Sequence, residues 1–142
     1  MADGELTVGD HIKQEIQRRV LMADKAHEMG KKYIMVDIDG TICHTPGDPK
    51  AGKDQFGFRN ATPYQKRIDY MNSLYDEGHF LHYWTARGSK SGTDWQGFTK
   101  AQLLSWGVKF TTLKLGKPHY DIWIDDKAQN DKEYFRNKRY TG

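Results

Sequence analysis

The chain has 142 residues, 37% of them hydrophobic and 29% charged, which suits one globular domain with a modest core. Its one cysteine excludes an intrachain disulfide, and no apolar stretch approaches the roughly 20 residues that span a bilayer. The formal net charge of +3 suits an anionic substrate but is too small to indicate nucleic-acid binding. With no secretion pattern at the N-terminus, we expect a cytoplasmic protein without membrane contact.

The first element that the pattern predicts is an amphipathic helix over residues 10–29. Ile12 and Ile16 belong to a series of apolar residues at helical spacing, with charged residues between them. We therefore divide the chain into an N-terminal helical extension, residues 1–30, and a main domain, residues 31–142. The helix could form an interface with a second copy of the chain or cover the sheet of the main domain, and the sequence does not separate these.

Short apolar runs alternate with helical patterns in the main domain. The runs that predict strands cover residues 33–36, 80–84, 108–115 and 120–124. The patterns that predict helices begin at Thr62, Thr93 and Ala128. Such alternation predicts an α/β fold, a three-layer Rossmann-like parallel sheet with helices on both faces. Residues 42–61 are too irregular for a long helix, and we expect a loop or short hairpin there that could act as a flap.

Polar side chains come directly after the predicted strands. Asp37 follows the first strand, Thr85 follows the second, and Asp125 follows the fourth. Lys117 lies in the loop that enters the fourth strand. Because ligands bind at the carboxyl ends of the strands in open parallel sheets, we expect these residues to form one site.

Two carboxylates lie in the segment that follows the first strand. Side chains two apart on an extended segment point the same way, so Asp37 and Asp39 can face one pocket. Asp37, Asp125 and Asp126 supply the hard oxygen ligands that Mg²⁺ prefers. Taken alone, the Asp-Ile-Asp-Gly-Thr segment could also be a turn or a calcium loop.

Together these segments resemble the four motifs of the haloacid dehalogenase (HAD) superfamily, in the family's order. The matching residues are Asp37-Ile38-Asp39-Gly40-Thr41, Thr85, Lys117 and Asp125-Asp126. The segments around Thr85 and Lys117 further resemble small phosphatases of capsule and surface-polysaccharide biosynthesis. Many HAD enzymes insert a cap domain after the first motif or between the second and third. Here the segment from Thr41 to Thr62 is only about 20 residues long, and that from Thr85 to Lys117 about 30. The resemblance therefore implies a HAD core without a cap and with an open site.

The resemblance also implies a role for each residue. Asp37 would attack phosphorus and form an aspartyl-phosphate, and Asp39 would be the general acid and then the general base. Thr85 would hold phosphoryl oxygens, and Lys117 would neutralise charge on phosphate. Mg²⁺ would be held by Asp37, Asp125, Asp126 and the backbone carbonyl of Asp39. An aspartate at position 39 favours a phosphatase, because an alkoxide leaving group needs a proton.

Two residues after Thr85 stands an arginine with two interpretations. Arg87, with Ala86 beside it, could bind a second anionic group or a sugar hydroxyl of the substrate, or it could form a structural ion pair. We retain both.

The sequence thus predicts a Mg²⁺-dependent phosphomonoesterase acting on a sugar phosphate or similar small metabolite. The open site and the basic, aromatic C-terminal segment allow an alternative, a phosphatase on nucleic-acid 3′ ends or another macromolecule. A third hypothesis is a non-catalytic binding module with the same fold, which the intact motifs disfavour.

Overall fold

The computed structural model describes residues 7–47, 55–89, 91–136 and 138. The chain divides into two compact units, residues 1–33 and residues 34–142, and each is described by itself. Among the described residues, no helix is both long and apolar enough to cross a bilayer.

The first unit contains the helix α1, Val8–Glu28, so the helix predicted over residues 10–29 is confirmed. A capping box that the sequence analysis missed starts it two residues earlier. Thr7 Oγ1 accepts a hydrogen bond from Asp10 N at 3.0 Å, and Asp10 Oδ2 accepts one from Thr7 N at 3.1 Å. These bonds satisfy backbone donors that the first turn would otherwise leave unpaired.

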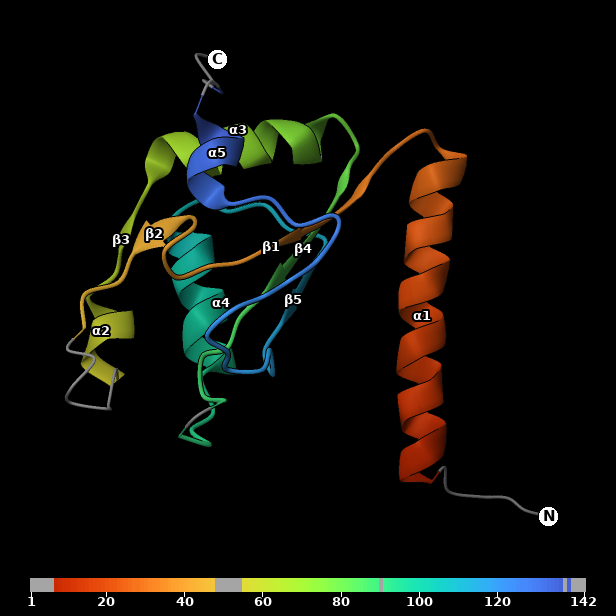
Figure 1. The fold of residues 1–142 in the computed structure, drawn as a ribbon, viewed down its shortest axis with the longest axis horizontal. Coiled ribbons are helices and arrows are strands. Elements are labelled where there is room, and N and C mark those ends of the chain that lie inside the picture. The colour runs from red at the N-terminus through yellow and green to blue at the C-terminus, as the bar shows by residue number, and fades with distance from the viewer. Residues whose placement is uncertain (1–6, 48–54, 90, 137, 139–142) are drawn as a thin grey trace. The chain divides into compact units, whose positions relative to one another are not determined.

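The second unit is built on a parallel sheet of three strands in the order β1-β4-β5 (Figure 1). The strands are β1 (Tyr33–Val36), β4 (Phe80–Trp84) and β5 (Thr112–Lys114). In the β4–β5 pair, His82 lies opposite Thr112 and Trp84 lies opposite Lys114. The predicted α/β class, a parallel sheet flanked by helices, is confirmed.

Two helices provide the crossovers between these strands. The helix α3 (Gln65–Asp76) joins β1 to β4, and α4 (Gln96–Ser105) joins β4 to β5. Apolar side chains of these helices pack on the sheet: Ile68 and Met71 of α3 and Leu103 of α4 are fully buried, as are Leu81 and Tyr83 of β4. Burial of each such aliphatic side chain contributes about 1.5–3 kcal/mol. This core fixes the carboxyl ends of β1 and β4, where the candidate site lies.

The segment between β1 and α3, for which we expect a loop or short hairpin, contains one pair of very short strands and a helix. Its strands β2 (Cys43–His44) and β3 (Thr62–Pro63) pair antiparallel, and a short helix, α2 (Gln55–Arg59), lies between them. The helix start predicted at Thr62 is wrong, because Thr62 pairs with a strand and α3 begins at Gln65. The centre of the proposed flap, residues 48–54, lies outside the described residues, so its role stays a prediction.

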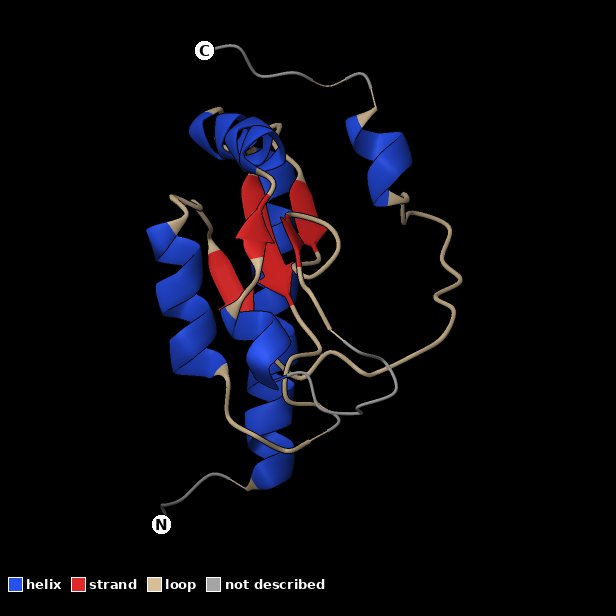
Figure 2. Ribbon diagram, turned by 90° about the vertical axis from the view of Figure 1, so that its left-hand side faces the viewer, coloured by secondary structure: helices blue, strands red, loops and turns tan. Residues whose placement is uncertain are grey.

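The predicted fourth strand, residues 120–124, is wrong. This stretch has no strand partner in the part of the chain that the structure describes, and it belongs to a long loop between β5 and α5 (Asp131–Phe135) (Figure 2). Ile122 and Ile124 are 77% and 92% exposed. Local contacts replace the strand pairing: the Trp123 ring packs edge-on against Trp84, and Asp125 Oδ1 accepts a hydrogen bond from Lys127 N at 2.7 Å.

Candidate active site

Asp37 and Asp39 lie in a sharp turn directly after the end of β1. The turn is closed by hydrogen bonds from Thr41 N and Ile42 N to Ile38 O, both at 3.0 Å. Gly40 has a φ of 80°, a left-handed conformation that a residue with a Cβ would adopt only at a cost. The sequence therefore places a glycine where the chain must reverse, and both aspartates stay at the carboxyl end of the sheet.

Lys117 lies beside Asp37, as the sequence predicts. Its Nζ is 3.4 Å from Asp37 Oδ1, and its backbone N donates to Thr85 O at 3.1 Å. Thr41 Oγ1 donates to the other oxygen of Asp37 at 3.3 Å. Three of the four predicted motifs therefore meet at one edge of the sheet.

Burial is the main influence on the charge of Asp37. It raises the pKa of this carboxyl above its ordinary value, while the positive charge of Lys117 acts in the opposite direction. The Asp37 side chain still exposes 37% of its surface, whereas Lys117 exposes 12%. Asp37 is thus reachable from solvent and has a cation beside it.

Asp39 is held by Arg87 in a bidentate ion pair. Arg87 Nε donates to Oδ2 and Nη2 donates to Oδ1, both at 2.9 Å, and Thr45 Oγ1 donates to Oδ1 as well. The Arg87 side chain is fully buried, and its Nη1 donates to Gln102 Oε1 at 2.7 Å. Of the two interpretations of Arg87, the geometry matches the structural ion pair, because the guanidinium is engaged on three sides.

The loop after β4 connects the second and third motifs. Thr85 is almost fully buried, and its Oγ1 accepts a hydrogen bond from Arg87 N at 3.1 Å. Ala86 O accepts from Ser89 N at 2.9 Å, which closes a tight turn. Ser89 Oγ in turn donates to Lys117 O at 2.7 Å. The turn therefore fixes the loop that carries Lys117.

Two aromatic rings complete the surroundings of Lys117. Its Nζ lies 5.3 Å from the ring centre of Tyr120 and 5.7 Å from that of Trp123. Such contacts attract a cation to the ring faces and restrict where Lys117 can point.

The structure does not bring Asp125 and Asp126 to Asp37. Asp125 accepts hydrogen bonds from Lys127 N and Trp123 Nε1, and these bonds lower the pKa of its carboxyl. No group of three or more His, Cys, Asp or Glu side chains that could hold a metal occurs among the residues described. The predicted Mg²⁺ ligands are therefore not assembled in this arrangement, since the fourth strand that would align them does not form.

Three residues at the site were missed by sequence reasoning: Thr45, Ser89 and Gln102. Each acts through a residue of the motifs, by holding Asp39, the Lys117 loop or Arg87. Polar residues in loops and on helix surfaces carry no sequence signal that separates these roles from solvation. Buried Cys43 is also close, with burial raising its thiol pKa to about 11, which fits a packing role.

Comparison with known proteins bears on the fold. No protein-family model matches the chain, and no curated protein matches it significantly. A solved structure of a structural-genomics target from Vibrio cholerae is similar, with a TM-score of 0.57 and 24% sequence identity. The similarity covers 72% of this chain and 86% of that chain. At this identity the likeness supports the α/β fold alone.

Proposed function

We propose that this chain is a phosphomonoesterase in which Asp37 is the nucleophile. The observation that supports this most is the pairing of Asp37 with Lys117 at the carboxyl end of β1. An Asp37 oxygen would form a bond to phosphorus as the ester oxygen leaves, giving an aspartyl-phosphate that water hydrolyses. Lys117 would neutralise charge on the transferred phosphoryl group. The resemblance to HAD phosphatases points to the same chemistry.

Asp39 is the candidate for proton transfer in this proposal. Its Oδ1 accepts from both Arg87 and Thr45, whereas Oδ2 accepts only from Arg87 among the described residues. A carboxylate oxygen has two lone pairs, so Oδ2 keeps one position that would carry the proton given to the leaving oxygen and, once emptied, would accept a proton from the hydrolytic water. Arg87 would act as a positioning residue that fixes the direction of this oxygen.

The proposed need for Mg²⁺ has its support in the motif resemblance alone. Asp37 would offer a carboxylate and Asp39 its backbone carbonyl, because Arg87 binds only the Asp39 side chain, and Mg²⁺ usually completes its six oxygen ligands with water. The full ligand set that the resemblance implies would also require Asp125 or Asp126 to move toward Asp37. No catalytic step above depends on the metal.

The substrate we favour is a sugar phosphate or similar small metabolite. A panel of phosphate esters, with 3′-phosphorylated oligonucleotides included, should be tested with Mg²⁺ and with EDTA. We expect Asp37→Asn to lose about 10⁴-fold or more in kcat, the scale typical of a lost nucleophile. Asp76→Asn is the matched control, because Asp76 lies in an exposed ion pair on α3. Equal hydrolysis by wild type and Asp37→Asn would refute the proposal, and an inert wild type would favour a binding module.

A further inference from the structure

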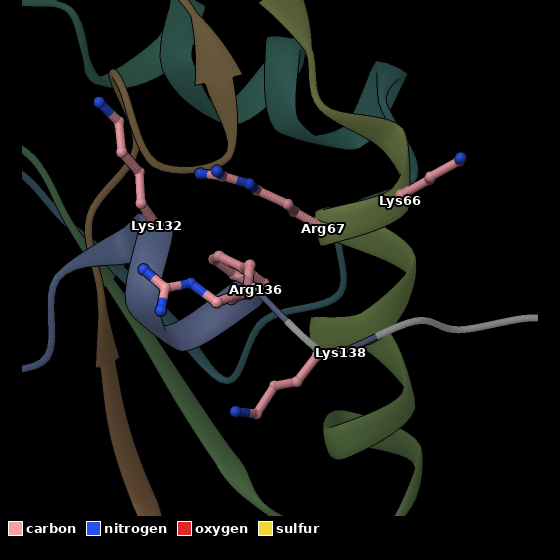
Figure 3. A pocket seen from close by; sticks show the side chains of 6 residues that line it. Lys66, Arg67, Lys132, Arg136 and Lys138 are labelled. Atoms are coloured by element: carbon pink, nitrogen blue, oxygen red, sulfur yellow. The ribbon is translucent and has the colours of Figure 1, made fainter.

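A hollow of about 290 Å³ between α3 and the C-terminal segment is lined almost entirely by cations (Figure 3). Arg67 reaches into it from α3, and α5 and the residues after it supply the opposite wall. The lining residues are Lys66, Arg67, Lys132, Phe135, Arg136 and Lys138. Five of these six residues are basic, in a chain whose whole formal charge is only +3.

Only part of this charge is neutralised locally. Arg67 pairs with Asp131 at 2.8 Å, and Arg136 pairs with Glu133 at 2.5 Å. The three lysines form no ion pair within the part of the chain that the structure describes. Gathering like charges costs free energy, and an anion in the hollow would offset that cost.

The lining also indicates which kind of anion fits. A protein partner would need an apolar centre, and Phe135 is the one apolar residue of the hollow. That ring is already covered by the Arg67 guanidinium, 4.8 Å from its centre. Interfaces with nucleic acid are more polar and far more positive than those with protein. Flexible lysines that act as point charges suit a chain of phosphates.

A hydrogen-bonded path joins the hollow to the candidate active site. Arg67 Nη1 donates to Thr41 O at 2.9 Å, and Thr41 Oγ1 donates to Asp37 Oδ2. The hollow therefore borders the loop that carries the proposed nucleophile.

We propose that the hollow lined by Lys66, Arg67, Lys132, Arg136 and Lys138 binds the phosphodiester backbone of nucleic acid. This binding does not depend on the proposed phosphatase chemistry. If both proposals hold, the hollow would favour substrates that carry more phosphates than the one removed.

The test is fluorescence anisotropy with a labelled single-stranded oligonucleotide that lacks terminal phosphates. The three lysines form no ion pair with any described residue, although Lys138 Nζ donates to Tyr134 O at 2.8 Å. If each of them neutralises one phosphate of a single strand, log affinity against log salt should have a slope of about −2, since each phosphate contributes about −0.7. Affinity should then fall about 20-fold between 50 and 200 mM salt. The double variant Lys66→Glu/Lys132→Glu should lose at least about tenfold in affinity at 50 mM salt. Both changes lie in first turns of helices, where acidic residues are well tolerated.

The matched control is Lys25→Glu/Lys100→Glu, which changes two exposed lysines outside the hollow by the same total charge. It should stay within about threefold of wild type. Equal losses in the two double variants, or equal displacement of the probe by polyglutamate, would overturn the proposal. Asp37→Asn should bind the probe like wild type. A wild-type protein that binds the probe but hydrolyses no phosphate ester would refute the phosphatase alone, and one that hydrolyses esters but does not bind the probe would refute this site alone.

Discussion

The ion pair between Arg87 and Asp39 gives the sharpest test of the site's physical basis. Arg87→Met keeps an apolar stem of similar length but leaves the Asp39 carboxylate without its cation. Breaking a buried pair costs about 3–5 kcal/mol, and Asp39 is 25% exposed, so water offsets part of the loss. We therefore expect about 3 kcal/mol. With an unfolding entropy of about 2.1 cal/mol/K per residue, this lowers Tm by about 10 °C.

Urea unfolding at pH 7, followed by circular dichroism, measures this loss directly. Lys109→Met is the matched control, because its pair with Asp76 has the 2.8 Å distance of a good ion pair but is about half exposed. It should cost less than about 1 kcal/mol. Arg87→Lys should recover only part of the loss, since an ammonium cannot bind both carboxylate oxygens in a planar fork. A cost below about 1 kcal/mol for Arg87→Met would refute the reasoning.

Three further predictions concern Asp37 and the loop after β5. Burial raises the pKa of Asp37 in the folded protein, so ionisation of this carboxyl destabilises the fold and wild type loses this stability as pH rises from 3 to 7. Asp37→Asn has no such carboxyl, so its unfolding free energy should increase relative to that of wild type over this range. Urea titrations that show the opposite trend would contradict the prediction. Ile124→Ser should change the unfolding free energy by less than about 0.5 kcal/mol, because Ile124 is exposed, whereas Leu81→Ala in the core should cost about 2–5 kcal/mol. A cost above about 1.5 kcal/mol for Ile124→Ser would mean that residues 120–124 do form a strand. Trp123 Nε1 donates to Asp125, so a movement of Asp125 toward Asp37 on Mg²⁺ binding should change the fluorescence of Trp123 in wild type but not in Asp37→Asn. Trp123→Phe identifies the part of the signal that comes from this residue. Metal-dependent activity without the fluorescence change would argue against the movement.

The elements that the sequence predicts correctly are those whose pattern reflects local burial. The apolar runs before Asp37 and Thr85 form neighbouring strands, so both residues arrive at the same edge of the sheet. The run over residues 120–124 is also rich in apolar and aromatic residues but forms no strand, because strand formation also needs a partner at the right distance. Contacts of Trp123 with Trp84 and Lys117 hold this segment elsewhere, and composition does not encode that competition.

The partner of Asp39 was not predictable as such, since Arg87 lies 48 residues further along the chain. A signal for its burial was nevertheless present. Tyr83, Thr85 and Arg87 are each at most 2% exposed, whereas Trp84 and Ala86 between them are only partly buried. An arginine at the inward position of such a series must have a partner, and Asp39 of the first motif is the carboxylate that it binds.

The side chains of Asp37 and Asp39 carry the same functional group but differ in how tightly their neighbours hold them. Asp39 is fixed by a buried guanidinium at two 2.9 Å hydrogen bonds, so moving it toward phosphorus would break a desolvated ion pair. Asp37 has one cation at 3.4 Å and a hydroxyl at 3.3 Å, both longer contacts, and its side chain is more exposed. A nucleophile must approach and then leave the phosphorus atom, whereas a proton-transfer group must hold one direction. Under the proposed phosphatase chemistry, the packing around each residue therefore fits Asp37 as the nucleophile and Asp39 as the proton-transfer group.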